Sequence, residues 1–424
     1  MPRLLDWTLK GLPAKAEGTD AARIGELGLS LLAEDLMLPA AILKEAALAH
    51  NERWMRAFTQ QTGVRLCPHG KTTMSPELMH RQLRNGAWGI TAATAHHVRV
   101  YRRSGIGRVL LANQLIGRSN IAFVVEELAR DPDFDFYCLV DSVRGVELLA
   151  DALAVHPRRA PIQVLLEVGA SGGRTGVRTR AQALELVQAI KRCPNALLLR
   201  GIEGFEGIFP GTPAGEQDVR ELLGLMAAVA VDVDTIDGFA AGPVILSAGG
   251  SAFFDLVAAS LKQVRLPRPV EVVLRSGCYL THDHGTYAEH FARIERRSAG
   301  AINSGSGLRA ALEVWAYVQS VPEPGSLFVA LGRRDVSHDA GLPRPVLWFR
   351  PGHHDQPVAV PETYHVERLY DQHAHLGVPA DCPMIVGDMI GFGISHPCTT
   401  FDKWRTLFVV DDAYRVIDCV RTFF

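Results

Sequence analysis

Short apolar runs alternate with helical stretches from residue 65 to residue 275, and this alternation limits the folds available to the chain. Short apolar runs separated by amphipathic stretches are typical of parallel strands connected by helices. Eight such strands are expected, at residues 65–68, 89–94, 107–112, 136–140, 162–168, 197–204, 244–248 and 271–275. Because about 250 residues is the usual size of a closed (β/α)8 barrel, the sequence predicts an α/β fold of the TIM-barrel type.

An open, doubly wound parallel sheet is the alternative for this pattern. That fold carries a G-x-G-x-x-G turn after its first strand, and no such turn follows residues 65–68. After about Leu280 the pattern changes to short strand-like runs separated by turns rich in Pro, Gly and Asp. We therefore expect an N-terminal segment (1–34) that packs on a β domain, a barrel (35–280) and a C-terminal, mainly-β domain (281–424).

The composition argues against several classes of protein. A formal net charge of −2 gives no electrostatic support for binding nucleic acid or an anionic membrane. We expect neither a signal peptide nor a membrane span, because charges and Pro13 interrupt the N-terminal residues and no apolar run is long enough to cross a bilayer. Seven scattered cysteines without a C-x-x-C pair fit a reducing compartment, so the cytoplasm is the expected location.

The stretch Pro68-His69-Gly70-Lys71-Thr72 follows the first expected strand. Lys71 would therefore lie at the carboxyl end of a strand, which is where α/β barrels carry their chemistry. A lysine whose ammonium group is partly desolvated can lose its proton and form a Schiff base with a carbonyl compound. The alternative is an ordinary surface lysine, and Lys71 alone does not decide between the two.

Two loops after later strands are rich in glycine and small residues. The loop at 246–251 lies between a strand and a helix, where backbone N–H groups can approach a phosphate. The loop at 275–279 follows the last strand and can complete the same phosphate-binding site. The alternatives are an ordinary helix cap and a turn with a packed tyrosine. The residues concerned are Gly249, Gly250, Ser251, Gly277, Cys278 and Tyr279.

Two further motifs carry charged or metal-binding side chains. Arg174 lies in a glycine-rich loop, from which a guanidinium can reach a cofactor ring or a carboxylate; a solvated arginine is the alternative. His396 and Cys398 share one face if their segment is extended, and both are zinc ligands. A metal ion held by two protein ligands would have coordination positions open for substrate and water. The alternative is that Cys398 is a buried thiol beside an unrelated histidine and that neither binds a metal. The histidines at 282–284, 353–354 and 373–375 are weaker candidates.

Taken in order, these motifs resemble those of the fold-type III pyridoxal-phosphate (PLP) enzymes, and among them the D-serine dehydratase and D-threonine aldolase family. The resemblance runs from about Asp35 to the C-terminus. Its most specific element is the stretch 68–72, which is similar to the family's Pro-His-x-Lys-Thr around the Schiff-base lysine. The other matching stretches are 86–90, 173–177, 249–251, 277–283 and 395–400.

The resemblance implies a barrel that carries PLP and a β domain that carries a divalent metal, zinc or manganese. It implies that Lys71 holds PLP and acts in catalysis, and that His396 and Cys398 bind the metal. It also implies a homodimer and a small D-amino acid as substrate. The remaining cofactor-binding residues that it implies are His69, Thr94, Arg174, Gly249, Gly250, Ser251, Gly277, Cys278 and Tyr279.

Several positions depart from the family's pattern or bear on the reaction. Gly70 replaces an expected larger residue, and Phe205 stands where tyrosine is common. Ile208 stands where the aldolases have histidine, and Cys398 gives the dehydratase form His-x-Cys instead of His-x-Asp. Both favour a dehydratase, which eliminates water from a D-hydroxy amino acid and gives a 2-oxo acid and ammonia.

Two other reactions of the same fold stay open. A D-threonine aldolase-type lyase would give glycine and an aldehyde, and a racemase would need a second base that no motif assigns. D-Serine, D-threonine and 3-hydroxy-D-aspartate are all candidate substrates.

Overall fold

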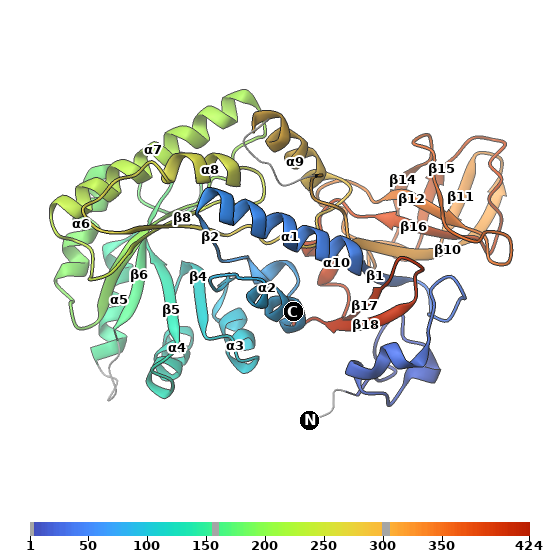
Figure 1. The fold of residues 1–424 in the computed structure, drawn as a ribbon, viewed down its shortest axis with the longest axis horizontal. Coiled ribbons are helices and arrows are strands. Elements are labelled where there is room, and N and C mark those ends of the chain that lie inside the picture. Colours follow the sequence, from blue (N-terminus) through green and yellow to red (C-terminus); the bar gives the residue numbers. More distant parts are fainter. Residues whose placement is uncertain (1–3, 155–160, 299–305) are drawn as a thin grey trace.

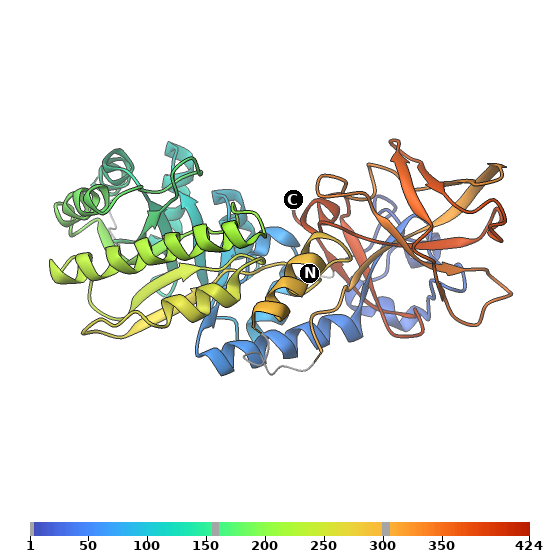
Figure 2. The ribbon, with the colours of Figure 1, turned by 90° about the horizontal axis from the view of Figure 1, so that it is seen from above.

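The computed structural model describes residues 4–154, 161–298 and 306–424, which form two domains side by side (Figures 1 and 2). Eight parallel strands make one curled sheet in the order β2-β9-β8-β7-β6-β5-β4-β3. The predicted (β/α)8 architecture is confirmed. The strands are β2 Arg65–Leu66, β3 Ile90–Ala92, β4 Arg108–Gln114, β5 Asp135–Val140, β6 Ile162–Val168, β7 Leu197–Gly204, β8 Val244–Ala248 and β9 Val270–Leu274.

The two edge strands of this sheet, β2 and β3, meet just before Lys71. An isolated parallel bridge joins His69 to Thr91, beyond the two residues of β2. The Thr91 N–H donates to the Pro68 carbonyl at 2.9 Å, and the Thr91 hydroxyl donates to the Cys67 carbonyl at 2.6 Å. These bonds close the barrel and fix the start of the loop that carries Lys71.

A helix follows each strand from β2 to β8, and α1 precedes β2 (Figure 1). Thr94, Thr179 and Thr212 cap α3, α6 and α7, each accepting a hydrogen bond at 3.2 Å from the N–H three residues later. A cap of this kind contributes about 1 kcal/mol. The helices are α1 Glu45–Thr62, α2 Pro76–Arg84, α3 Ala95–Arg103, α4 Arg118–Arg130, α5 Val143–Ala154, α6 Arg180–Lys191, α7 Pro213–Thr235 and α8 Phe254–Leu261.

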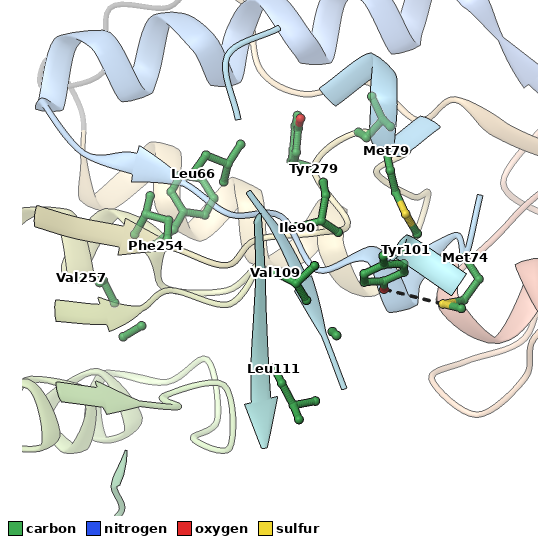
Figure 3. Packing of buried hydrophobic residues seen from close by; sticks show 14 of the residues in the cluster. Leu66, Met74, Met79, Ile90, Tyr101, Val109, Leu111, Phe254, Val257 and Tyr279 are labelled. Atoms are coloured by element: carbon green, nitrogen blue, oxygen red, sulfur yellow. Dashed lines mark hydrogen bonds between the residues drawn. The ribbon is translucent and has the colours of Figure 1, made fainter. Parts of the chain in front are cut away.

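Packing of α3 against the Lys71 loop accounts for the glycine at position 70. Tyr101 of α3 is fully buried, and its hydroxyl donates to the Met74 sulfur at 3.7 Å (Figure 3). A Cβ at Gly70 would lie 2.4 Å from that hydroxyl oxygen. Tyr101 therefore fills the space of the larger side chain that the family pattern leads one to expect at position 70.

The second domain is a ten-stranded sheet, which confirms the predicted mainly-β region. Its central path runs β13-β12-β16-β10-β1-β17-β18, and β11, β15 and β14 extend from β10. Two helices, α9 Thr286–Arg297 and α10 Cys398–Phe401, belong to this half of the chain. The strands are β1 Ala40–Lys44, β10 Leu312–Glu323, β11 Ser326–Val329, β12 Arg344–Phe349, β13 Val358–Ala359, β14 His365–Leu369, β15 Ala374–Gly377, β16 Met389–Gly393, β17 Thr406–Val410 and β18 Val416–Arg421.

The strand β1 belongs to the second domain although it lies within residues 35–280, the range expected for the barrel. It pairs antiparallel with β10 and parallel with β17. Its apolar side chains are buried on both faces, because Ala40 and Ile42 pack with the N-terminal segment and Ala41 and Leu43 pack in the main core cluster. Leu5, Leu12 and Ile24 of that segment pack in one cluster with Trp315 and Phe408 of the sheet.

The connection from the barrel to the second domain is tightly packed at His284. The His284 N–H donates to the Ile394 carbonyl at 2.9 Å. Gly393, the last residue of β16, faces the imidazole, and a Cβ at this position would lie 2.4 Å from the His284 Cγ. The close approach of strand and ring therefore requires glycine. Among the helices in the part of the chain that the structure describes, none has the length and hydrophobicity of a membrane span.

We predict that Gly393→Ala lowers the stability of the protein by about 1–3 kcal/mol, because the added methyl group overpacks the domain junction. Gly224→Ala is the matched control, since a Cβ at Gly224 on α7 has no atom within 4 Å. Alanine in an exposed helix raises stability by about 0.5–1 kcal/mol relative to glycine. Thermal melting of the two variants checks both signs, and an unchanged melting temperature for Gly393→Ala would contradict the packing account.

Candidate active site

The carboxyl ends of the barrel strands carry the candidate site. Lys71 lies in a short 3-10 turn, Gly70–Thr72, directly after β2, and its side chain is exposed. Two wide hollows, of about 620 and 590 Å³, lie at the opposite end and share Arg65, Gly86 and Glu271. Because barrel enzymes carry their chemistry at the carboxyl ends, these hollows are not candidates for the active site.

The imidazole of His69 is held neutral beside Lys71. Burial is the main cause that lowers the pKa of His69 well below its usual value, and the Lys71 charge adds to it. Burial likewise lowers the pKa of His97 to about 4, with the His96 and Lys71 charges as smaller causes. The buried Nδ1 of His69 has no hydrogen-bond partner within the described ranges. Lys71 is therefore flanked by neutral rings, and one of them has a free polar atom.

A cluster of two thiols and a hydroxyl joins the two domains next to Lys71. The Thr72 Oγ1 lies 3.6 Å from the Cys278 Sγ and 3.5 Å from the Cys398 Sγ, and the two sulfur atoms are 3.6 Å apart. A hydrogen bond from Cys278 lowers the pKa of Cys398, and the same bond, followed by burial, raises the pKa of Cys278. Cys278, which is predicted to bind the phosphate of the cofactor, thus lies beside Cys398, which is a predicted metal ligand.

His396 has the surroundings of a metal-binding histidine. Its Nδ1 is 2.6 Å from the Asp339 Oδ2, and the Thr399 hydroxyl donates to the Asp339 Oδ1 at 2.7 Å. Histidines that bind metals commonly donate their other ring N–H to a carboxylate in this way. The Nε2 then remains for a metal, and an imidazole with a thiolate suits zinc.

The predicted metal site is not a closed cluster of ligands. Across residues 4–154, 161–298 and 306–424, no three His, Cys, Asp or Glu side chains gather in a group able to hold a metal ion. The residues His396 and Cys398 therefore fit an open two-ligand site and not a closed structural one.

The loop after β8 binds an anionic group of the chain itself. The N–H groups of Gly249 and Gly250 donate to the two carboxylate oxygens of Glu206 at 3.0 and 2.6 Å. Glu206 is fully buried. Its carboxylate stands where the sequence predicts the phosphate of PLP. The donors thus fit an anion, and a phosphate bound by the same two amides would replace Glu206.

Three further residues of the predicted phosphate-binding set line one small cavity. Ser251, Cys278 and Tyr279 surround a space of about 10 Å³, together with Ser276 and His282. A space of this size holds about one water molecule. The Tyr279 hydroxyl is hydrogen-bonded to Gln82 and its ring is part of the hydrophobic core, so Tyr279 borders the cavity mainly through its ring.

Gly277 is placed by packing against the Lys71 loop. A Cβ at Gly277 would lie 2.5 Å from the His69 carbonyl oxygen and 2.9 Å from the Thr72 Oγ1. The glycine therefore allows the turn after β9 to approach the turn after β2. Its proximity to His69 and Thr72 brings the predicted phosphate and lysine motifs together.

Arg174 and Thr94 lie at the rim of the site. The Arg174 guanidinium lies 4.5 Å from the centre of the Phe205 ring. Thr94 is exposed and its hydroxyl is occupied in capping α3. The cofactor-binding roles of these side chains stay predictions.

A buried ion pair beneath Phe205 was not anticipated. Arg275 follows β9, donates to the Gly204 carbonyl at 2.7 Å and forms an ion pair with Glu203 of β7. Its guanidinium lies 5.8 Å from the Phe205 ring centre. The sequence also predicts no role for Glu203, Glu206 or Asp339, since none of them belongs to a local motif with a metal or phosphate spacing.

Family models match both halves of the chain. Residues 43–266 match the model described as "Alanine racemase, N-terminal domain". Residues 311–410 match the model described as "Putative serine dehydratase domain". The first match covers more than half of the chain and includes the barrel strands β2 to β8.

Individual proteins are similar over most of their length. The chain is 26% identical to a 3-hydroxy-D-aspartate aldolase of Paracoccus denitrificans (strain Pd 1222), over 73% of this chain and 75% of the relative. The D-threonine aldolase structure from Filomicrobium marinum superposes with a TM-score of 0.74 at 24% identity, covering 93% and 97%. The D-threo-3-hydroxyaspartate dehydratase from Delftia sp. HT23 gives 0.70 at 19%, covering 93% and 99%. The two structures support the fold.

We predict that His282 makes stability fall with acidification. Burial, assisted by the His284 charge, lowers the pKa of His282 to about 4. The unfolded chain, with a pKa near 6.5, binds the proton more readily, so this contribution is present above pH 6.5 and is lost toward pH 4. A difference of 2.5 pKa units corresponds to about 3 kcal/mol.

Replacing His282 with Asn should remove that part of the pH dependence, and asparagine tolerates the positive φ of 47° at this position. Denaturant unfolding at pH 7 and pH 4.5 measures the change. His353→Asn, in an exposed turn, is the control. An equal pH dependence in wild type and His282→Asn would contradict the prediction.

Proposed function

Because the chain belongs to the family of the alanine racemase N-terminal domain, we propose that it is a PLP- and metal-dependent lyase that dehydrates a D-3-hydroxy amino acid. One observation carries the proposal. The Cys398 sulfur lies 3.5 Å from the hydroxyl of Thr72, the residue next to Lys71. The proposed metal ligand of the second domain thus meets the lysine motif of the barrel at one point.

The cofactors and the side chains of the protein would have separate roles in the reaction. PLP, when bound, supplies an electron sink for charge that develops on the substrate Cα. A metal ion, when bound, supplies a Lewis acid that makes hydroxide a better leaving group. Lys71 would hold the PLP, and its Nζ would take the Cα proton of the substrate. His396, oriented by Asp339, and Cys398 would hold the metal.

Ile208 supports dehydration over aldol cleavage. A retro-aldol reaction needs a group that removes the proton of the substrate hydroxyl. Position 208, where the aldolases have histidine, carries an apolar side chain that packs on the Arg174 loop: a Cβ at Gly173 would lie 2.9 Å from the Ile208 Cδ1. This position therefore supplies no base. The match of residues 311–410 to the serine dehydratase domain supports the same reaction.

An aldolase is the second candidate, favoured by the name of the relative that is 26% identical, a 3-hydroxy-D-aspartate aldolase. Zinc as the metal, a homodimer and a cytoplasmic location belong to the proposal as expectations from the sequence.

We predict that Lys71→Ala abolishes covalent attachment of PLP. The wild-type protein, incubated with PLP and desalted, should keep a visible absorbance band, and borohydride reduction should fix the cofactor on the peptide that contains Lys71. The variant should lose both signals. Lys191→Ala, in an exposed position on α6, is the control. Cofactor fixed on another lysine would refute the assignment.

We predict that the PLP- and zinc-loaded protein converts D-serine or D-threonine into a 2-oxo acid and ammonia. Removing a metal ligand should slow this reaction by about 100-fold or more while PLP stays bound, so Cys398→Ala should be nearly inactive and Cys193→Ala, remote in the turn after α6, should match wild type. Assays for 2-oxo acid, ammonia and glycine measure the products. Glycine and acetaldehyde from D-threonine would make the protein an aldolase instead.

A further inference from the structure

The amino-terminal end of the barrel, opposite the candidate active site, carries a layer of polar side chains. Leu110 of β4 and Tyr137 of β5 belong to the apolar cluster inside the barrel. The residues two positions earlier, Arg108 and Asp135, are the first residues of the same strands. Since alternate residues of a strand face the same side, these charged side chains form the next layer of the barrel interior.

This layer surrounds a hollow instead of a packed core. Barrels of this type are usually filled by layers of branched apolar side chains. Here the layer opens into a hollow of about 590 Å³, a volume typical of pockets that bind small molecules. The charged side chains that line the hollow are Arg65, Arg108, Arg200, Asp135 and Glu271.

The two carboxylates neutralise two of the three arginines. The Arg108 Nε donates to the Asp135 Oδ2 at 2.5 Å, and the Gln163 Nε2 donates to the Asp135 Oδ1 at 2.7 Å, so both oxygens of Asp135 have donors. Glu271 lies 3.8 Å from the Arg65 guanidinium. One positive charge in the hollow is therefore left over.

Arg200 carries this uncompensated charge. Its Nη1 donates to the Ala241 carbonyl, and no carboxylate forms an ion pair with it within the described ranges. The buried Nε of Arg200 has no hydrogen-bond partner there either. A partly buried guanidinium whose N–H groups lack acceptors favours an anion close to it.

An adjoining hollow of about 620 Å³ adds two more arginines and shares Arg65 and Glu271 with the first. Arg56 of α1 and Arg84 of α2 line it, and neither forms an ion pair in the part of the chain that the structure describes. The two hollows together have five arginines and two carboxylates, in a chain with a formal net charge of −2. Positive charge is thus concentrated at this end of the barrel.

We propose that the amino-terminal end of the barrel is a second binding site, which takes a small organic polyanion with two or more phosphate or carboxylate groups. Guanidinium groups bind both kinds of group through paired hydrogen bonds. Because the hollows share the wall at Arg65, one elongated ligand can place an anionic group in each. The concave shape and limited volume fit a small molecule and not a nucleic acid. The site does not involve Lys71, so it is independent of the proposed function.

Calorimetric titration of the full-length protein, incubated with PLP and desalted, tests the proposal with pyrophosphate and with citrate as probes. We expect one site per chain, with an affinity that falls as salt is added. Arg200→Gln and Arg65→Gln should each weaken binding by about 10-fold or more, because each removes a charged hydrogen-bond donor. Arg333→Gln, at an exposed position in the second domain, is the matched control and should bind like wild type.

The outcomes decide both the site and the kind of ligand. Tighter binding of pyrophosphate than of citrate assigns phosphate groups to the ligand, and the reverse order assigns carboxylates. Equal binding by wild type and both variants places the anion elsewhere and overturns the site. No binding of either probe in the millimolar range also overturns it, and leaves the arginines to neutralise the carboxyl ends of helices such as α2. If Arg200→Gln does not fold, Arg65→Gln decides, since the Arg65 side chain is 62% exposed.

Discussion

The candidate site depends on the closure of the barrel. Residues 67–69 pair on one side with the end of β9 and on the other with Thr91. The strand β2 has only two residues, so the pairing that matters continues beyond it. The Cys67 N–H donates to the Leu274 carbonyl at 2.7 Å, and the His69 N–H donates to the Arg275 carbonyl at 3.2 Å. On the other side the same segment pairs with Thr91. Because backbone bonds hold both edges, the Lys71 turn begins from a fixed position between the turns after β9 and β3.

The second domain completes the site because the chain crosses between the domains more than once. The strand β1 starts in the second sheet and leads through α1 into the barrel, and the segment after β9 leads back. The two domains are therefore tied at both ends of the barrel sequence. Sites between domains are common because each side can supply different chemical groups. Here the barrel supplies the lysine and the anion-binding loop, and the second domain supplies His396 and Cys398.

The local features of the fold could be predicted from sequence, and the long-range ones could not. The barrel strands from β3 to β9 are mostly buried apolar runs, so their positions are visible from residue type. The strand β1 is hard to separate from a helix by residue type, because its apolar run continues directly into α1. The strands β13, β14 and β16 lack this signal, since β13 and β14 are largely exposed and β16 contains two glycines.

Within the site, the Lys71 turn and the glycine loops are local motifs and were found. Asp339 and Glu206 act on groups 57 and 43 positions away, and no spacing rule links such pairs.

The Glu206 carboxylate shows how the fold handles its anion-binding loop. A fully buried carboxylate is costly unless hydrogen bonds compensate for its lost hydration. Two amides that converge on its oxygens at 3.0 and 2.6 Å provide charge-assisted bonds of this kind. The same two N–H groups cannot serve a second anion at the same time. A phosphate that binds at Gly249 and Gly250 therefore gains only the difference between its own bonds and those of Glu206. The affinity of this loop for a phosphate would then depend on where the displaced carboxylate goes, as well as on the loop itself.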